Sequence, residues 1–178
     1  MNINKAEEDI LKPKIHESVF IAKGAHIYGD VEILEGSSVW FNAVIRGDEG
    51  KITIGRNTNI QDNTVIHSDM MVDVIIGNNV AIGHGAIIRG CTIGNNVMVG
   101  MNSTVMTYSE IGEFSIIGAN SFIPYRKKFK PKSLIHGVPA KRIRELRDEE
   151  LETSITTTEI YRGLIESYSN KAIRSFRD

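Results

Sequence analysis

The stretch that decides the fold is NVAIGHGAIIRGCTIG, which runs from Asn79 to Gly94. Ile82, Ile88 and Ile93 recur in it, first six and then five residues apart. An α-helix turns every 3.6 residues and would spread such a series around its axis, whereas a single strand alternates with period two. A short β-segment followed by a tight corner fits the interval of six. The stretch therefore predicts a repeating β-coil.

The same ladder of aliphatic anchors runs through most of the chain. It needs a three-residue insertion after Ile45, a four-residue insertion after Ile66 and one dropped residue after Ile88. Small or β-branched residues, such as Ala86 and Thr92, follow many anchors by four positions. The anchors are Ile15, Ile21, Ile27, Ile33, Val39, Ile45, Ile54, Ile60, Ile66, Ile76, Ile82, Ile88, Ile93, Val99, Val105, Ile111, Ile117 and Ile123. No single repeat can bury its apolar face alone, so the repeats should stack as a parallel β-helix. A sandwich of irregular short strands is the alternative.

The pattern also predicts where the β-helix lies in the chain. We expect the β-helix over residues 12–124, a basic connector over 125–147 and a helix over 148–178, together forming one domain. Asn78-Asn79 and Asn95-Asn96 are expected at corners, where asparagine accepts a left-handed backbone. The stretch HGVPAK, from His136 to Lys141, should turn the chain. Asp148 is the expected N-cap of the helix. The apolar stripe of this helix is expected to pack on the β-helix or on a neighbouring subunit; it comprises Leu151, Ile155, Thr158, Ile165 and Tyr168.

Composition narrows the class of protein. The 178 residues carry 21 basic and 22 acidic side chains, a net charge of −1, which does not favour binding to nucleic acid or to an anionic membrane. The first residues, MNINKAEEDILKPK, lack the apolar segment of a signal peptide, and no run is long enough for a membrane span. The single cysteine, Cys91, fits a reducing compartment. We therefore expect a soluble cytoplasmic protein.

Four motifs in the chain carry a family resemblance. They are SVWFNAVIRGDEGKITIG (Ser38–Gly55), NTNIQDNTVIH (Asn57–His67), the two segments IGNNVAIGHGAII and GCTIGNNVMVGM on either side of Arg89 (Ile76–Met101), and GVPAKRIREL (Gly137–Leu146). With these motifs the chain resembles the γ-class carbonic anhydrase-like branch of the bacterial hexapeptide-repeat, acyltransferase-like superfamily, over residues 12–170. The resemblance implies a mainly β protein: a left-handed parallel β-helix with three hexapeptides per coil, followed by a C-terminal α-helix. It also implies a homotrimer.

Three hexapeptides per coil place the polar residues of the ladder in columns. Arg46, His67 and Arg89 each follow anchors one coil apart, so they should stack at about 4.8 Å per coil. Asp62 and His84 should stack along a different edge. The two histidines can then share a site only where two subunits meet, and a trimer would contain three such sites. The insertions near 48–50 and 68–74 should form the rim of each site.

The resemblance implies zinc ligands, and here the chain departs from the family. His67 and His84 correspond to two of the three zinc-binding histidines, and Arg89 stands in the third place. A guanidinium has no lone pair for a metal and adds a full positive charge beside it. Two histidines and an arginine do not make a zinc anhydrase site, so we expect zinc, or another divalent metal, to bind weakly or not at all. Cys91 is a second candidate ligand, but we expect it to be a small buried residue.

The resemblance assigns pocket or catalytic roles to six further residues: Arg46, Asp48, Asn59, Gln61, Asp62 and Tyr161. Arg46 and Asp48 either orient the pocket at the subunit contact or form only a salt bridge there. In the family the glutamine equivalent to Gln61 positions water or bicarbonate, although Gln61 could instead satisfy backbone groups at a corner. Tyr161 either reaches the pocket or packs against the prism. The long acidic loop of the founding members is absent, and only Glu49 lies in the short insertion.

Three functions remain open on the sequence alone. The first is hydration of CO2 to bicarbonate at a metal site between subunits, which Arg89 opposes. The second is acyl transfer from acetyl-coenzyme A, with His84 or His67 as the general base. The third is a non-catalytic trimer that clamps a small anion, such as a carboxylate, between Arg46 and Arg89.

Overall fold

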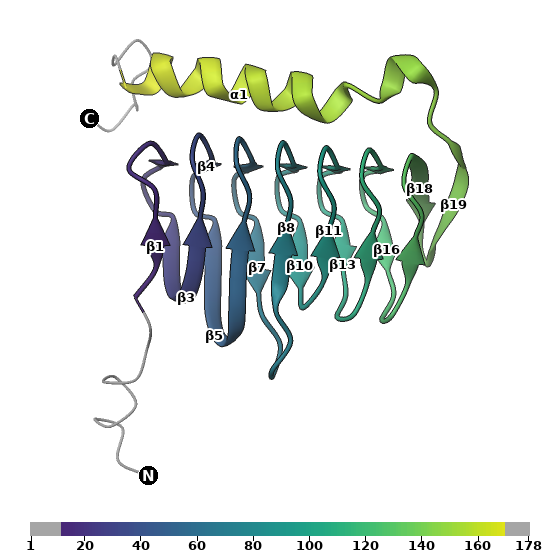
Figure 1. Ribbon diagram of the computed structural model, residues 1–178, viewed down its shortest axis with the longest axis horizontal. Coiled ribbons are helices and arrows are strands. Elements are labelled where there is room, and N and C mark those ends of the chain that lie inside the picture. Colours follow the sequence, from purple (N-terminus) through teal and green to yellow (C-terminus); the bar gives the residue numbers. More distant parts are fainter. Residues whose placement is uncertain (1–11, 170–178) are drawn as a thin grey trace.

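The computed structural model describes residues 12–169. The chain winds into a parallel β-solenoid of about seven turns, the architecture of a left-handed hexapeptide-repeat β-helix, with one helix lying along it (Figure 1). Each full coil contributes short strands to three faces. The first face consists of β5 (Val44–Ile54), β7 (Val65–His67), β10 (Ile87–Arg89), β13 (Thr104–Val105) and β16 (Phe122–Ile123).

The second face continues the same sheet around a corner, because the long strands β3 and β5 turn with it. It consists of β1 (Lys14–Ile15), β3 (His26–Ile33), β8 (Val74–Ile76), β11 (Thr92–Ile93), β14 (Glu110–Ile111) and β17 (Lys128–Phe129). The third face is a separate sheet of β2 (Phe20–Ile21), β4 (Ser38–Val39), β6 (Asn59–Ile60), β9 (Ala81–Ile82), β12 (Met98–Val99), β15 (Ile116–Ile117), β18 (Ser133–Gly137) and β19 (Ala140–Glu145).

The anchors of the ladder stack in register inside the prism. On the first face, Ile66 pairs with Ile45 and Ile88, and the next coil continues from Ile88 to Val105. Every predicted anchor from Ile33 to Ile123 is at most 2% exposed. Only the first coil differs: Ile21 is 43% exposed, because no coil covers the outer side of the end of the prism. The predicted coil of three hexapeptides is confirmed.

The corners contain the predicted asparagines. Asn79 and Asn96 have φ of 54° and 56°, in the left-handed region that asparagine tolerates. Cys91 points into the core, because the residue dropped after Ile88 shifts the phase of the coil by one. Thr92 is exposed on the second face.

The β-helix extends beyond Pro124, so the predicted connector over 125–147 is wrong. Phe129 continues the interval of six after Ile123, lies in register with Ile111 and is 7% exposed, and Ile135 continues it again in register with Ile117. An aromatic anchor between lysines hid this part of the ladder. The predicted turn at HGVPAK is present, as β18 and β19 form an antiparallel hairpin there.

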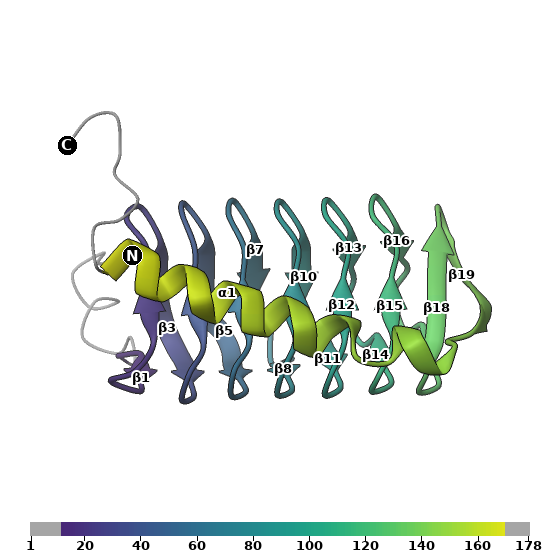
Figure 2. The ribbon, with the colours of Figure 1, turned by 90° about the horizontal axis from the view of Figure 1, so that it is seen from above.

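One helix covers the third face (Figure 2). Asp148 begins a short 3-10 turn, η2 (Asp148–Glu150), and the helix α1 (Thr153–Ser169) starts later, so Asp148 is not its N-cap. Ser154 and Thr158 are the buried residues of α1, and the hydroxyl of Ser154 donates to the Val97 carbonyl at 3.0 Å. The rest of the predicted helix, residues 170–178, lies outside the described residues. Within 12–169 no helix is long and apolar enough to cross a bilayer.

Candidate functional site

The predicted column of Arg46, His67 and Arg89 is present. Arg46 and Arg89 pair with His67 from the two sides in the parallel strands of the first face. All three lie where the chain leaves the first face for the second, an edge that we name the Arg89 corner. The prism geometry expected from the sequence therefore holds for these side chains.

Asp48 links two members of this column. Its carboxylate accepts from the Arg46 guanidinium and lies 3.0 Å from His67 Nε2, while Glu49 lies 3.8 Å from the same nitrogen. Burial raises the pKa of Asp48, but hydrogen bonds from His67, from its own backbone and from Arg46 outweigh it and leave this pKa below its usual value. The Arg46–Asp48 pair thus exists within one subunit and also fixes the imidazole of His67.

Arg89 is held by a residue that sequence reasoning missed. Its Nη2 donates to Asp69 Oδ1 at 3.1 Å, and Thr107 Oγ1 donates to Asp69 Oδ2 at 2.7 Å. These two bonds, with a third from the Met70 amide, lower the pKa of Asp69 to about 2. The charge of Arg89 is therefore paired rather than bare. Only the position of Asp69 in the predicted insertion could have indicated this partner.

The two insertions meet at this corner, as expected for a common rim. The Met71 amide donates to the Glu49 carbonyl at 2.9 Å, and the Glu49 amide donates to Ser68 Oγ at 3.3 Å. In Figure 1 the loop between β7 and β8 projects from the same edge as the bend of β5. The rim is thus a pair of backbone-bonded loops beside His67 and Arg89.

Asp62 and His84 stack at the opposite edge of the first face, which we name the His84 corner. His84 Nδ1 lies 2.7 Å from Asp62 Oδ2, and His84 Nε2 lies 3.2 Å from the Tyr161 hydroxyl. An ionised carboxylate accepts from Nδ1–H, which leaves Nε2 as the acceptor nitrogen of the ring. The three side chains form a continuous hydrogen-bonded series, Asp62–His84–Tyr161.

Tyr161 reaches this corner from α1. Its ring packs edge-on against Trp40, with the centroids 5.1 Å apart. Burial, and secondly the charge of Asp62, raises the pKa of Tyr161 to about 12. The phenol therefore stays protonated at neutral pH and donates to His84. Tyr161 thus packs on the prism with its ring and contacts His84 with its hydroxyl, and its part in a functional pocket stays a prediction.

The remaining residues of the NIQD motif support the corner from beneath. Gln61 Oε1 accepts from the His84 amide at 3.2 Å, and Gln61 Nε2 donates to Asn59 Oδ1 at 3.0 Å. Asn59 is 1% exposed, and within the described residues its Nδ2 is buried without a partner. Gln61 thus acts as the corner residue that satisfies a backbone group. Its contact with water or bicarbonate stays a prediction.

One chain does not bring the two histidines together. His67 follows the strands of the first face and His84 precedes them, so the width of that face separates the Arg89 corner from the His84 corner. His16, His26 and His136 belong to neither corner; His136 Nδ1 lies 3.3 Å from Ser121 Oγ. Cys91 is buried, as predicted, and burial raises the pKa of its thiol to about 12.

The donors at these corners do not fit a catalytic zinc. Such a site needs three neutral or anionic protein ligands and an open position. Arg89 offers none and is bonded to Asp69, the Nε2 of His67 faces Asp48, and the Nε2 of His84 faces Tyr161. The side chains at the two corners therefore disagree with the metal that the family resemblance implies.

Comparison with known proteins places the chain in a family. The model of the bacterial transferase hexapeptide (six repeats) matches residues 12–47 and 90–124. A probable carbonic anhydrase of Methanocaldococcus jannaschii is 52% identical over 78% of this chain and 87% of its own length. The mitochondrial gamma carbonic anhydrase 2 of Arabidopsis thaliana is 34% identical over 92% of this chain, which spans only 61% of that protein. A hexapeptide transferase family protein from Anaplasma phagocytophilum has a crystal structure with a TM-score of 0.84 and 42% identity, over 88% of this chain and 92% of that one.

Proposed function

This chain belongs to the γ-carbonic anhydrase-like branch of the hexapeptide-repeat proteins, and we propose that within this branch it is a metal-independent acyl-transfer enzyme whose sites lie at the contacts of a homotrimer. His84 is the general base in this proposal, and a hydroxyl or amine is the acyl acceptor. The observation that carries it is the series Asp62–His84–Tyr161, with 2.7 Å on one side of the ring and 3.2 Å on the other.

The character of the three faces supports the trimer. Helix α1 covers the third face, and the second face carries the Glu110–Lys128 ion pair. The first face has no cover within the described residues, and its outward column carries Val65, Ile87 and Phe122, which are 37–45% exposed, with Thr104 between the last two. Exposed apolar side chains gathered on one face are typical of a protein contact. Trimer contacts through this face would bring the His84 corner of one subunit to the Arg89 corner of the next.

The functions that the resemblance suggests first are less well supported. Zinc-dependent hydration of CO2 needs a third ligand where Arg89 is tied to Asp69. An anion clamp needs two free guanidinium groups, but Arg46 is paired with Asp48 and Arg89 with Asp69. The acid–base series at His84 has no such conflict.

The chemistry follows from the tautomer of His84. Asp62 holds the proton on Nδ1, and the lone pair of Nε2 takes the proton of an acceptor hydroxyl or amine that displaces the Tyr161 hydroxyl. The acceptor oxygen or nitrogen bonds to the thioester carbonyl carbon and the carbon–sulfur bond breaks. The proton then passes from Nε2 to the leaving thiolate. Acetyl-coenzyme A is the simplest donor of this class.

The other predicted residues have positioning roles in this proposal. Gln61 and Asn59 fix the backbone on which His84 sits, and Tyr161 holds Nε2 before the acceptor arrives. Asp48 and Arg46 orient His67 on the facing corner. The cytoplasmic location expected from the single cysteine stays a prediction.

The test compares thioester turnover, CO2 hydration and metal content in one preparation. His84→Gln should lower thiol release from acyl-coenzyme A with a panel of amine and hydroxyl acceptors by roughly 10²–10⁴-fold. His16→Gln, a change of the same type at an exposed position outside both corners and outside the first face, should leave the rate unchanged. Stoichiometric zinc with rapid CO2 hydration would replace the proposal by the reaction of the named anhydrases.

A further inference from the structure

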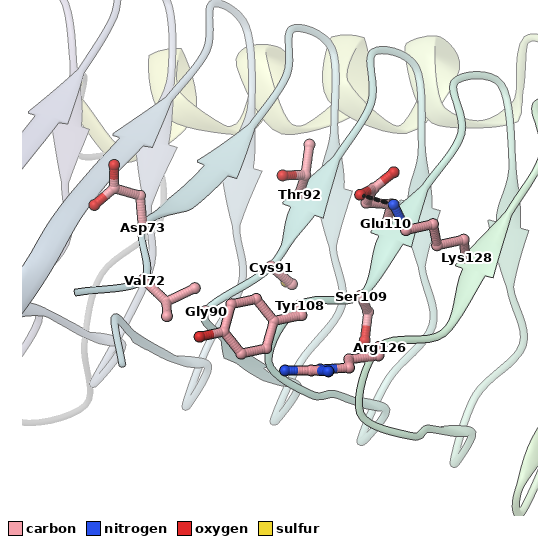
Figure 3. A pocket seen from close by; sticks show the side chains of 10 residues that line it. All are labelled: Val72, Asp73, Gly90, Cys91, Thr92, Tyr108, Ser109, Glu110, Arg126 and Lys128. Carbon is pink, nitrogen blue, oxygen red and sulfur yellow. Dashed lines mark ion pairs between the residues drawn. The ribbon is translucent and has the colours of Figure 1, made fainter. Parts of the chain in front are cut away.

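A cavity lies where the Arg89 corner passes into the second face, and none of the side chains assigned to a site above lines it. Its volume is about 340 Å³, within the range of small-molecule sites. Two columns of residues, each one coil apart, line most of it (Figure 3): Gly90, Tyr108 and Arg126, and Thr92, Glu110 and Lys128. It begins one residue after Arg89 and extends onto the second face through Thr92, Glu110 and Lys128.

A glycine occupies the first position of one of these columns, where the backbone is left-handed and the space for a side chain is already filled. Gly90 has φ of 49°, and a Cβ there would come within 2.8 Å of the Thr107 methyl group. The next two positions of the column instead carry the large side chains of Tyr108 and Arg126, which form one wall (Figure 3). The Tyr108 ring is 44% exposed and forms part of the lining. A flat apolar surface is therefore available beside an empty space.

Arg126 is fixed in place without using its hydrogen-bond donors. Its guanidinium carbon lies 5.2 Å from the ring centroids of both Tyr108 and Tyr125, which pack edge to face. Among residues 12–169 no carboxylate pairs with Arg126, whereas the neighbouring Lys128 is bound to Glu110 at 2.5 Å. A stacked guanidinium with free donors is suited to bind a planar anion such as phosphate in bidentate fashion.

The segment beside the cavity is strongly basic, although the lining also includes two carboxylates, Asp73 and the Glu110 that is paired with Lys128. Residues 126–132, RKKFKPK, contain five cations and no acid in a chain of net charge −1. The sequence alone suggested a solvated connector, but the structure builds this segment into a coil and directs part of it to the cavity wall. Local positive charge of this kind favours ligands with more than one negative charge.

We propose that this cavity binds a nucleoside diphosphate, with the base stacked on Tyr108 and the phosphates on the guanidinium of Arg126. Such a ligand has both a ring for the aromatic surface of Tyr108 and a diphosphate for the guanidinium of Arg126. The hydroxyl of the exposed Thr92 lies across the hollow and is available to the ribose. The proposal does not depend on the acid–base site at His84.

The test is calorimetric titration of the whole protein with ADP, adenosine and pyrophosphate in turn. ADP should bind more tightly than either fragment, and added salt should weaken it. Arg126→Gln and Tyr108→Leu should each raise the dissociation constant by roughly tenfold or more. Lys23→Gln removes the same charge type from an exposed residue of the first coil and should change nothing. His84→Gln should bind ADP as tightly as the parent does. A failure of the acyl-transfer proposal can therefore be distinguished from a failure of ADP binding.

Three outcomes would overturn the proposal. One is the absence of ADP binding at millimolar concentration in a folded protein. Another is an equal loss of affinity in Lys23→Gln, which would indicate unspecific attraction of anions. The last is pyrophosphate binding as tightly as ADP without an effect of Tyr108→Leu, because the site would then recognise phosphate alone.

Discussion

Arg89 and Asp69 are joined by a hydrogen bond of 3.1 Å, which ties the residue in the place of the third metal ligand to the insertion loop of its own subunit. The Thr107 hydroxyl holds the other carboxylate oxygen. The family resemblance implies a metal-binding histidine at this position, whereas this chain has an arginine that is hydrogen-bonded to the insertion loop. The predictions for this corner follow from that difference.

Replacing Arg89 by histidine should create affinity for zinc. Arg89→His removes the guanidinium and supplies a third imidazole to the set of His67 and the neighbouring subunit's equivalent of His84. We expect this variant to retain stoichiometric zinc through dialysis, whereas the parent loses it. Elemental analysis measures the difference, and a gain of CO2 hydration would accompany it if the geometry is restored.

The control for this change is Arg89→Ala, which removes the charge and supplies no ligand. It should bind little more zinc than the parent does. If the parent already holds zinc as firmly as Arg89→His, the assignment of the ligand positions is wrong.

Loss of the Asp69 carboxylate should release the insertion loop. Asp69→Asn weakens the charge-assisted bond to Arg89, so hydrogen exchange at Met70 and Met71 should become faster. Lowering the pH should also make hydrogen exchange in the loop faster. The pKa of Asp69 is lowered from 3.8 to about 2, so its stabilising contribution is present above pH 3.8 and is lost as the pH falls toward 2. Unchanged exchange in Asp69→Asn would mean that backbone bonds alone hold the loop.

A charge on the first face should dissociate the trimer. Ile87→Asp buries an unpaired carboxylate in the proposed contact, and we expect association to weaken roughly tenfold or more. Ile75→Asp is the matched control, because Ile75 lies on the second face and is exposed to a similar degree, 48% against 45%. Sedimentation at micromolar concentration distinguishes them. Equal effects of the two changes would place the contact elsewhere.

Anchors inside the prism should matter far more than the same residue at its end. Ile82 is fully buried, so Ile82→Ala should lower the free energy of unfolding by about 2–5 kcal/mol. Ile21→Ala, at a position that is 43% exposed, should cost much less. Denaturant unfolding of both variants gives the comparison. Similar small losses at both positions would mean that the prism core does not supply the stability.

The Tyr161 hydroxyl should titrate later than an ordinary phenol. Its pKa is raised from 10.0 to about 12, so the stability it contributes is present below pH 10 and is lost as the pH rises toward 12. Ultraviolet titration should show a step near pH 12 that Tyr161→Phe abolishes. Tyr28→Phe, at a tyrosine that is 58% exposed, should leave this step in place. If the step near pH 12 is still present in Tyr161→Phe, it belongs to another residue.

Most of the fold could be predicted from the sequence because each coil repeats one simple rule. An aliphatic anchor every six residues, with asparagine at corners, placed Ile45, Ile66 and Ile88 in one register. The rule failed where its residue types changed. Phe129 serves as an anchor between lysines, and its size and neighbours concealed the last coils.

The site was predictable only where it follows the ladder. The columns of His67 with Arg89 and of Asp62 with His84 follow from counting residues once the family resemblance supplies three hexapeptides per coil. Asp69 could not be placed, because an insertion leaves the periodic path and its side chains follow no spacing rule. The cavity beside Tyr108 was equally hidden, since it depends on how the side chains of successive coils lie at a corner.

The regular coils also govern how this chain can change in length. Ile93, Ile111 and Phe129 stand above one another at intervals of 18 residues, and each coil contacts only the coils beside it. Deleting one such unit would bring the flanking coils together with every anchor in phase, whereas a deletion of any other size would turn inward residues outward. Additions that are not whole units must leave through a corner, as the loop carrying Asp69 does. The prism can thus be shortened or lengthened by whole coils, while insertions of other lengths form loops at its corners.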